Sequence, residues 1–398
     1  MSSNQRSKTD VASVPLRICF VDHAGVLGGA ELCLLDIAAH FSTRGKVVLF
    51  SDGPFRTVLE SKGVEVEILP APKAISSIKR GGARGRELLA IPSVLVFAWK
   101  LARLFKEFDV IVANSQKALV VSSIASFFAR KPLVWYLHDI ITAEHFGALN
   151  RMADVFLGNF FTSRIIANSE STRASYQEAG GTNKAIAVIH SGIDPARFEI
   201  PESELEALRM ELGLSRAPIA SVFSRLTPWK GQHVVIRALR EVPDVQLLIV
   251  GAPLFSGEAE YEAKLKRMVH DFDLADRVKF LGFREDVPKL LKMSDFPIHS
   301  SIAPEPFGRV IVEGMMAEKP VIATKGGGAN EIITHMKTGV LISPNQPEEL
   351  ASAMQMLLRD PETARAIASK GRAEAIHRFS VESMLCGIER EVCAVSRT

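Results

Sequence analysis

Short apolar runs alternate with segments of helical periodicity through the first half of the chain. Each run ends in polar residues or glycine, which is typical of a buried parallel strand followed by a loop. The segments at 32–41, 55–62 and 88–108 carry apolar residues at three- and four-residue steps, which predicts helices. This alternation predicts a parallel sheet with interleaved helices. The predicted strands cover residues 16–21, 46–50, 64–69, 110–113, 132–137, 165–167 and 187–189.

The same alternation starts again after a polar segment at 195–216, which we interpret as a connector with a short charged helix. A second α/β series at this length predicts a second domain with its own core. We therefore expect an α/β protein of two domains, at 16–195 and 196–380, facing across a cleft, a preferred place for a ligand. The second series has predicted strands at 218–223, 245–250, 278–281, 321–323 and 340–342, and predicted helices at 233–239, 261–272, 287–292, 347–358, 361–379 and 381–395.

Polar residues follow several predicted strands directly. Asn114 ends one of them, and His138 and Asp139 end the next. In open α/β sheets the carboxyl edge of the strands is where ligands bind. His138 is therefore a candidate site residue, with a structural hydrogen-bonding role as the alternative.

A glycine pair, Gly28-Gly29, lies between the first predicted strand and the first predicted helix. The spacing does not match G-x-G-x-x-G, so it does not indicate a dinucleotide site. Two interpretations stay open. The glycines form only a tight turn, or their backbone N–H groups contact a phosphate or a sugar.

Residues 304–331 (PEPFGRVIVEGMMAEKPVIATKGGGANE) read as loop, helix, strand and glycine-rich turn. The loop opens onto a predicted helix from Val310, whose N-terminus offers free N–H groups and partial positive charge. Glu305 at the mouth of the loop is placed to hold sugar hydroxyls. Glu313, inside the helix, is placed to hold a ribose.

Arg225 and Lys230 share one strand-to-helix loop, with Pro228 and Gly231 shaping its turn. A planar guanidinium and a compact ammonium suit the oxygens of a diphosphate. No acidic cluster nearby would hold a metal, so the two cations could neutralise a diphosphate leaving group directly. The alternative is that they only cap a surface loop.

The composition excludes few classes of function. The 398 residues are 47% hydrophobic and 23% charged, and the formal net charge of +3 is too small to identify a partner. Four cysteines without C-x-x-C spacing favour reduced thiols in a reducing, cytoplasmic setting. Residues 1–15 are polar and read as a disordered lead-in. No run is long and apolar enough for a transmembrane helix.

A local basic cluster precedes the apolar segment at 88–108. This arrangement suggests peripheral contact with an anionic membrane or with an acceptor, and a solvated loop before a core helix is the alternative. The chain carries no aromatic platform beside the cluster, which argues against nucleic acid. The cluster consists of Lys79, Arg80, Arg84 and Arg86.

The motifs at 224–231 (SRLTPWKG) and 305–313 (EPFGRVIVE) strongly resemble those of the family 4 glycosyltransferases of the GT-B fold. The resemblance covers nearly the whole chain, and order and spacing together make it specific. One departure is Ser224, where the family usually has glycine; serine is small enough that we expect the loop geometry to survive. Further matching segments are 28–31, 138–139, 168–170, 191–194 and 282–283.

The resemblance implies a role for each candidate residue. Arg225 and Lys230 would bind the donor diphosphate, and Glu305 would hold hydroxyls of the donor sugar. Glu313 would hold the ribose, and His138 would lie beside the sugar. The same resemblance assigns Gly28 and Gly29 to the junction of donor and acceptor, Phe283 and Arg284 to the base, and Phe307, Gly308 and Arg309 to the donor loop.

The implied activity is retaining, metal-independent hexosyl transfer from a nucleoside-diphosphate sugar, without a cofactor, to a glycan, lipid-linked or small-molecule acceptor. We favour a UDP-sugar over GDP-mannose because such donors are common. The last helix, 381–398, would pack back on the first domain. The alternatives are a sugar-nucleotide epimerase or another GT-B enzyme, and a non-catalytic sugar-nucleotide-dependent module on a membrane surface.

Overall fold

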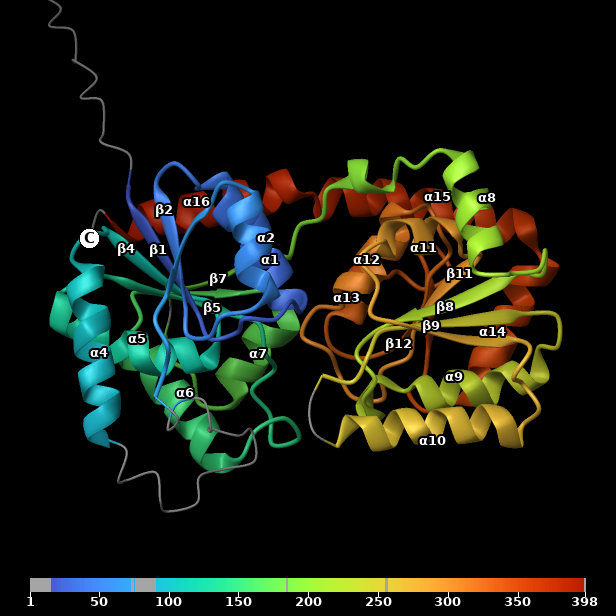
Figure 1. The fold of residues 1–398 in the computed structure, drawn as a ribbon, viewed down its shortest axis with the longest axis horizontal. Helices are drawn as coiled ribbons and strands as arrows, with labels where there is room; N and C mark the ends of the chain where they lie inside the picture. The colour runs from blue at the N-terminus through green and yellow to red at the C-terminus, as the bar shows by residue number, and fades with distance from the viewer. Residues whose placement is uncertain (1–15, 73–74, 76–90, 184, 255–256, 397–398) are drawn as a thin grey trace, which may run out of the picture.

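Two parallel β-sheets, one in each half of the chain, form the centre of the protein (Figure 1). The computed structural model describes residues 16–72, 75, 91–183, 185–254 and 257–396. The expected N-terminal lead-in at 1–15 lies outside the described residues. The same holds for the four residues of the basic cluster, Lys79, Arg80, Arg84 and Arg86.

The N-terminal sheet has seven strands in the order β3-β2-β1-β4-β5-β6-β7. Every neighbouring pair is parallel. The sheet confirms the strand series predicted from the sequence, with ends that shift by one or two residues. Its strands are β1 (Ile18–Asp22), β2 (Gly45–Leu49), β3 (Glu65–Ile68), β4 (Val110–Ala113), β5 (Leu133–Leu137), β6 (Arg164–Ala167) and β7 (Ile186–Val188).

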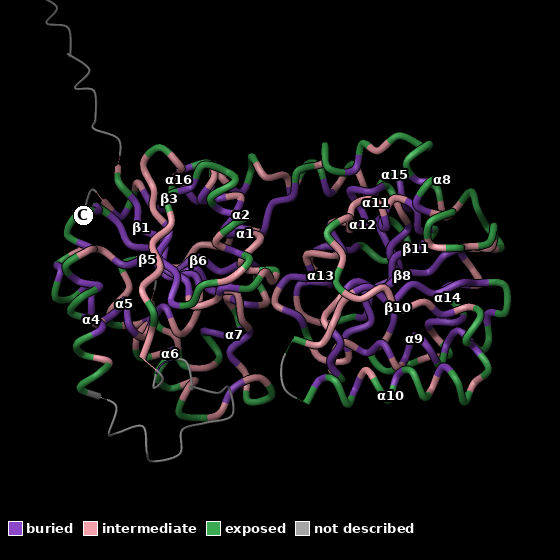
Figure 2. Tube along the Cα trace, viewed as in Figure 1, coloured by how far each residue is buried: buried purple, intermediate pink, exposed green. Residues whose placement is uncertain are grey.

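Helices cover both faces of this sheet, because alternate strand residues point to opposite sides. Cys19, Trp135 and Ile165 pack with helices of one face, and Phe20, Val134 and Tyr136 pack with helices of the other. The inner strands β1, β4, β5 and β6 are buried along most of their length, whereas the edge strands β3 and β7 are only partly buried (Figure 2). The first face carries α4 (Ile91–Phe105), α5 (Gln116–Ala129), α6 (Ala148–Phe160) and α7 (Glu170–Glu178), and the second carries α1 (Gly29–His40), α2 (Pro54–Ser61) and α16 (Val381–Val395).

The C-terminal sheet repeats the architecture with six strands in the order β10-β9-β8-β11-β12-β13. Two buried clusters again lie on its two faces. The strands are β8 (Ile219–Phe223), β9 (Gln246–Val250), β10 (Val278–Gly282), β11 (Phe296–His299), β12 (Ile322–Thr324) and β13 (Val340–Ile342).

The helices of the C-terminal half follow the predicted series closely. One prediction was too short at its start: α10 begins at Glu258 rather than at 261, because Gly257 with a φ of 95° sets the preceding turn. The α-helices are α8 (Glu202–Glu211), α9 (Gln232–Ala238), α10 (Glu258–Asp271), α11 (Val287–Met293), α12 (Arg309–Met316), α13 (Ala329–Ile332), α14 (Pro347–Arg359) and α15 (Pro361–Arg378), and the 3-10 turns are η2 (Pro195–Phe198), η3 (Pro228–Lys230) and η4 (Leu239–Glu241).

The chain crosses between the two halves at two adjacent places. Ile193 pairs in parallel with Ser380, and its backbone N–H donates to the carbonyl of Phe379 at 2.9 Å. After this crossing, α16 returns to the N-terminal half. Its Met384 and Ile388 are buried in the same cluster as residues of β1 and α1.

Candidate active site

The order of the strands alone indicates where each of the two sheets can bind a ligand. In each sheet the sequence order of strands reverses once, between β1 and β4 in the first and between β8 and β11 in the second. Open α/β sheets bind ligands outside the carboxyl ends of the strands at such a switch point. Most of the residues singled out from the sequence follow strand ends at these two edges.

Glu305 is the centre of the C-terminal site. It is 8% exposed, and its carboxylate oxygen Oε1 lies 2.6 Å from Lys230 Nζ and 2.7 Å from His299 Nε2. The hydroxyl of Ser301 donates to the same oxygen. Burial alone would raise the pKa of Glu305, but Lys230 and His299 outweigh it and hold this pKa well below its usual range. Glu305 is therefore a fixed negative charge and a weak base.

Lys230 reaches Glu305 because of the tight turn that follows β8. It ends η3, and the next residue, Gly231, has a φ of 73°. A Cβ at Gly231 would lie 1.9 Å from the carbonyl oxygen of Ser300, so only glycine allows this approach. The ammonium of Lys230 also lies 4.3 Å from the centre of the Trp229 ring. The turn thus fixes a cation between a carboxylate and an aromatic face.

The loop of Glu305 is tied to the glycine-rich turn after β12. Glu305 forms a backbone bridge with Gly327, and the N–H of Gly328 donates to the carbonyl of Glu305 at 2.9 Å. A Cβ on Gly327, whose φ is 57°, would lie 1.9 Å from the Glu305 carbonyl oxygen. The glycine cluster noted in the sequence therefore supports the position of Glu305.

Arg225 precedes Lys230 by five positions in the same loop, but its side chain has a different partner. Its Nε is 3.1 Å from a carboxylate oxygen of Glu258 at the start of α10. The amide of Gln232 donates to the Ser224 hydroxyl at 2.8 Å and to the Arg225 carbonyl at 2.9 Å. The serine that replaces the usual glycine thus takes part in holding the loop.

Arg309 joins the two halves of the molecule. Its Nε donates to Glu313 at 3.0 Å within α12, and its guanidinium lies 3.6 Å from Asp36 of α1. It also donates to the carbonyl of Gly192 at 3.4 Å. Both Arg309 and Glu313 are largely buried. Their assignment to the donor stays a prediction, because this geometry gives Glu313 a protein partner.

The other residues assigned to the donor are spread along the same carboxyl edge. Phe283 is exposed just after β10, and Arg284 binds both carboxylate oxygens of Asp286 at 2.8 and 2.7 Å. The Phe307 ring is buried and stacks on His190 at 5.7 Å. Gly308 precedes α12 with a φ of 99°. No direct contact joins Phe283 or Arg284 to Lys230 or Glu305 among the interactions we describe.

The N-terminal site is a hydrogen-bonded network at the switch point of the first sheet. Asn114, after β4, donates to buried Asp22 of β1 at 2.5 Å, and its carbonyl oxygen lies 2.9 Å from His138 Nε2. Because that oxygen can only accept, Nε2 of His138 donates. Burial lowers the pKa of His138 to about 4, against the opposing charges of Asp139 and Asp22. His138 is therefore a neutral imidazole at neutral pH.

Gly28 and Gly29 lie at the start of α1, a few residues after Asp22 of this network. Gly28 precedes the first turn of the helix, and its carbonyl accepts from the N–H of Leu32 at 2.9 Å. A Cβ on Gly28 would meet the Glu31 carboxylate at 2.7 Å, whereas a Cβ on Gly29 would meet nothing within 4 Å. Both the turn and the ligand interpretations of this pair remain predictions.

The lowered pKa of His138 predicts a stability effect with a definite sign. An unfolded histidine takes up a proton near pH 6.5, whereas the folded one resists protonation until about pH 4. His138 therefore contributes stability that is present above about pH 6.5 and is lost as the pH falls toward 4. We expect the melting temperature of the wild type to fall more steeply over this range than that of His138→Gln. Parallel curves for the two proteins would contradict the prediction.

Glu331 connects the halves at a second place, and the sequence reading gave it no role. Its carboxylate accepts from the backbone N–H groups of Glu170 and Ser171 at 2.9 and 2.7 Å, and lies 3.2 Å from His190 Nε2. Burial would raise the pKa of Glu331, but His190 and these N–H groups lower it overall. A carboxylate from α13 thus caps α7 across the two halves.

Three further residues of the C-terminal site were missed from the sequence. His299 ends β11 as His138 follows β5, so the rule applied to His138 would have found it. Trp229, beside Lys230, and Glu258, beside Arg225, carried no comparable signal, because their contacts depend on the tertiary fold. Among the described residues, no group of three or more His, Cys, Asp or Glu side chains is arranged to hold a metal.

Comparison with known proteins assigns both halves of the chain to one family. Residues 27–197 match the model described as Glycosyltransferase Family 4, and residues 206–374 match the model described as Glycosyl transferases group 1. The two models therefore meet close to the crossing between the sheets.

Solved structures resemble the protein over nearly its whole length. Anabaena HepE in complex with UDP and glucose is 40% identical, with a TM-score of 0.88 over 96% of this chain and 100% of that chain. HepE has also been solved with UDP-glucose, with the same identity and TM-score. A glycosyltransferase from Rickettsia africae, at 22% identity and a TM-score of 0.82, shares the fold.

Curated relatives match over a shorter span. A GDP-mannose-dependent alpha-(1-6)-phosphatidylinositol monomannoside mannosyltransferase from Mycolicibacterium smegmatis is 32% identical over 53% of this chain and 57% of its own length. A 2-deoxystreptamine glucosyltransferase from Streptomyces kanamyceticus is 27% identical over 61% of each chain. The chain thus spans little more than half the length of these relatives. From the two family models and the full-length match to HepE, we conclude that the chain belongs to the group 1, family 4 glycosyltransferases and has their GT-B fold.

Proposed function

We propose that the protein is a retaining hexosyltransferase that moves a sugar from a nucleoside diphosphate to an acceptor hydroxyl. The observation that carries the proposal is the contact of Lys230 and His299 with Glu305 at the switch point of the C-terminal sheet. A cation beside a carboxylate, at an edge suited to ligands, offers separate partners for a diphosphate and for sugar hydroxyls.

In the proposed reaction, the bond between sugar C1 and the diphosphate oxygen breaks, and its electron pair stays with the phosphate. The acceptor oxygen forms the new bond to C1 on the same face, and its proton passes to the departing phosphate. Arg225 and Lys230 stabilise the charge that develops on the leaving group. The pKa of Glu305 is held low, and its carboxylate already accepts hydrogen bonds from protein side chains. We therefore propose that Glu305 holds the sugar hydroxyls and does not act as a nucleophile.

His138 and its network belong to the N-terminal side of the proposed site. A neutral imidazole whose Nε2 donates to Asn114 keeps its Nδ1 as an acceptor for a sugar hydroxyl. The His145 ring lies 6.4 Å from that of Trp229, so the loop after β5 approaches the turn that carries Lys230. We place the acceptor between these two edges. A glycan, a lipid-linked sugar or a small molecule would each supply the hydroxyl.

UDP-glucose is the donor that we propose, since HepE, at 40% identity, has been solved with it. We expect UDP-glucose to raise the melting temperature more than GDP-mannose or ADP-glucose does, in buffer containing EDTA. A ligand at about one hundred times its Kd adds about 2.7 kcal/mol of stability. A larger shift in melting temperature with GDP-mannose would make GDP-mannose the donor. The mannosyltransferase relative is dependent on that nucleotide sugar. A shift that EDTA abolishes would contradict the proposed metal-free binding.

A further inference from the structure

Helix α6 turns its apolar side toward solvent. Leu149, Met152, Phe156 and Phe160 follow one stripe of the helix and are between 53% and 73% exposed. The side of α6 that is buried carries Asp154, only 3% exposed, and Gly158. A surface helix normally buries its apolar stripe and exposes its polar residues. The inner side of α6 also packs Val155 and Leu157 against the core, so the exposed stripe is a second apolar side. An apolar side left at the surface indicates contact with something apolar.

Aromatic residues of α5 extend this surface. Phe127 and Phe128 at the end of α5 are both exposed, with ring centres 5.8 Å apart. Phe161, directly after α6, lies 6.3 Å from Phe127 and 6.0 Å from Phe156. The rings therefore form one continuous cluster across the ends of two helices. We call it the aromatic surface.

Helix α4, packed beside α5 on the same face of the sheet, adds both apolar and basic residues (Figure 1). Val96 and Trp99 are exposed, and the guanidinium of Arg103 lies 4.7 Å from the centre of the Trp99 ring. Lys100 and Lys106 are exposed as well. An exposed aromatic ring paired with a cation is typical of the interface between water and lipid.

Among the described residues around the aromatic surface, basic side chains outnumber acidic ones: Lys100, Arg103, Lys106, Arg130 and Lys131 face only Glu107 and Asp109. Helices α4, α5 and α6 contain a single carboxylate, the buried Asp154, and burial raises its pKa to about 8, so it is mostly protonated at neutral pH. The cations Arg103 and Lys106 precede β4, and Arg130 and Lys131 precede β5. Because β4 and β5 are parallel neighbours, these cations lie at the same edge of the sheet.

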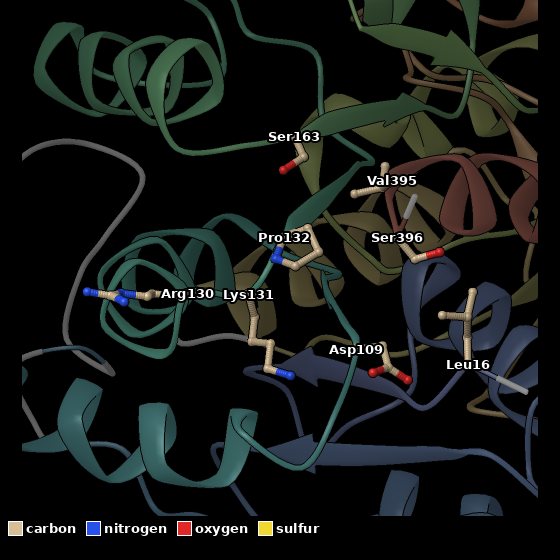
Figure 3. Close-up of a pocket in the computed structure, with 8 residues that line it drawn as sticks. All are labelled: Leu16, Asp109, Arg130, Lys131, Pro132, Ser163, Val395 and Ser396. Carbon is tan, nitrogen blue, oxygen red and sulfur yellow. The ribbon is translucent and has the colours of Figure 1, made fainter. Parts of the chain in front are cut away.

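Figure 3 shows the loop after α5 in detail. Arg130 and Lys131 line an open depression of about 700 Å³ together with Asp109 and Ser163. Arg130 and Lys131 follow the exposed rings of Phe127 and Phe128 in the chain, with Ala129 between them. Cationic side chains thus border the aromatic surface on the edge where α5 ends.

The geometry points to a membrane-docking surface made by α4, α5 and α6, with an anionic lipid bilayer as its partner. The rings and the apolar stripe of α6 would enter the interfacial region, and the bordering cations would bind anionic headgroups. A second copy of the chain fits less well, because a symmetric dimer would bring the same cations together. Within the described residues, no helix is both long and apolar enough to cross a membrane.

The aromatic surface shares no residue with the donor site, but helix α6 connects the two regions. Helix α6 starts after the loop from the carboxyl end of β5, where His138 lies, and ends before β6 begins. Its apolar stripe therefore runs from the edge with the candidate site to the edge with the cations. Docking along α6 would bring the carboxyl edge toward the lipid surface, where a lipid-linked acceptor is presented.

Flotation of the full-length protein with vesicles tests the inference. We expect it to float with vesicles of phosphatidylcholine containing about one third phosphatidylglycerol, and to float at least about tenfold less with phosphatidylcholine alone. The double variant Phe156→Ser/Phe160→Ser should lose at least about tenfold of the binding to anionic vesicles. Arg103→Glu/Lys106→Glu should lose a similar share. Met210→Ser, which removes an exposed apolar residue from α8, is the matched control and should float like the wild type.

Three results would overturn the inference. One is equal flotation of wild type and Phe156→Ser/Phe160→Ser, and another is equal flotation on neutral and anionic vesicles. The third is a wild-type dimer that this variant converts to a monomer while no form of the protein floats, which would make the aromatic surface a contact between copies. The shift in melting temperature with UDP-glucose should be the same in all variants, so failure of docking is distinguishable from failure of the donor site.

Discussion

Replacement of Lys230 by alanine is expected to lower kcat for hexosyl transfer by about a hundredfold to a thousandfold. In the structure its ammonium lies 2.6 Å from Glu305 at the mouth of the donor loop. In the proposed reaction, this ammonium and Arg225 would stabilise the charge that develops on the departing diphosphate. Loss of one preorganised charge that acts in the transition state has effects of this size. Steady-state assays with saturating UDP-glucose would measure the change.

The interpretation of Lys230→Ala depends on an intact fold. Lys264, exposed on α10, supplies the matched control, because Lys264→Ala removes the same charge from the same half of the protein. We expect the control to keep wild-type turnover. The melting temperature of Lys230→Ala should be compared as well, because Glu305 then keeps only His299 and Ser301 as partners. Turnover close to that of the wild type in Lys230→Ala would sink the assignment of the diphosphate site.

Replacement of Glu305 by glutamine is expected to reduce transfer by about a hundredfold or more while the shape of the side chain is kept. The amide lacks the negative charge that holds Lys230 and His299, and it presents a donor where the carboxylate only accepts. Both the position of Lys230 and the contacts to sugar hydroxyls should suffer. Measuring kcat and KM separately would show whether the loss is in the transition state or in donor binding.

The Glu305→Gln variant also has a pH signature. The pKa of Glu305 is held well below its usual value, so its charge contributes stability above the ordinary carboxyl pKa near 4. That contribution is lost as the pH falls through the lower folded value. The difference in melting temperature between wild type and variant should therefore be largest near neutral pH and shrink in acid. Glu260→Gln, at an exposed position of α10, should show no such difference. A difference that is constant with pH would argue against an ionised Glu305.

Much of the architecture was predictable from the sequence because burial is a local signal in a parallel sheet. Strands covered on both faces are apolar throughout, so β1, β4 and β8 were visible as short apolar runs. Glycine and proline marked the ends of helices, and α16 begins at Val381 as predicted. The motifs around Arg225, Lys230 and Glu305 were recognised because their sequence and spacing resemble those of one family, since each is a short continuous segment of the chain.

The partners within the site were not predictable. Lys230 meets Glu305 across 75 positions of the chain, and His299 joins them from another strand. The order β8-β11-β12 brings these segments to one edge, and periodicity carries no information about strand order. The contacts of Arg309 with Asp36 and of Glu331 with His190 depend further on how the two halves face each other.

Helix α6 shows most clearly what the sequence could not predict. Its sequence has an apolar stripe, and from the pattern alone that stripe would be assigned to the core. The tertiary structure instead buries the side with Asp154 and Gly158, where a Cβ on Gly158 would lie 2.6 Å from the hydroxyl of Tyr176 in α7. The sequence by itself determined which segments are strands and helices and which short motifs carry charge, since those properties depend on neighbours along the chain. The tertiary structure decided which charges meet and which apolar side faces outward, since those properties depend on packing between distant segments.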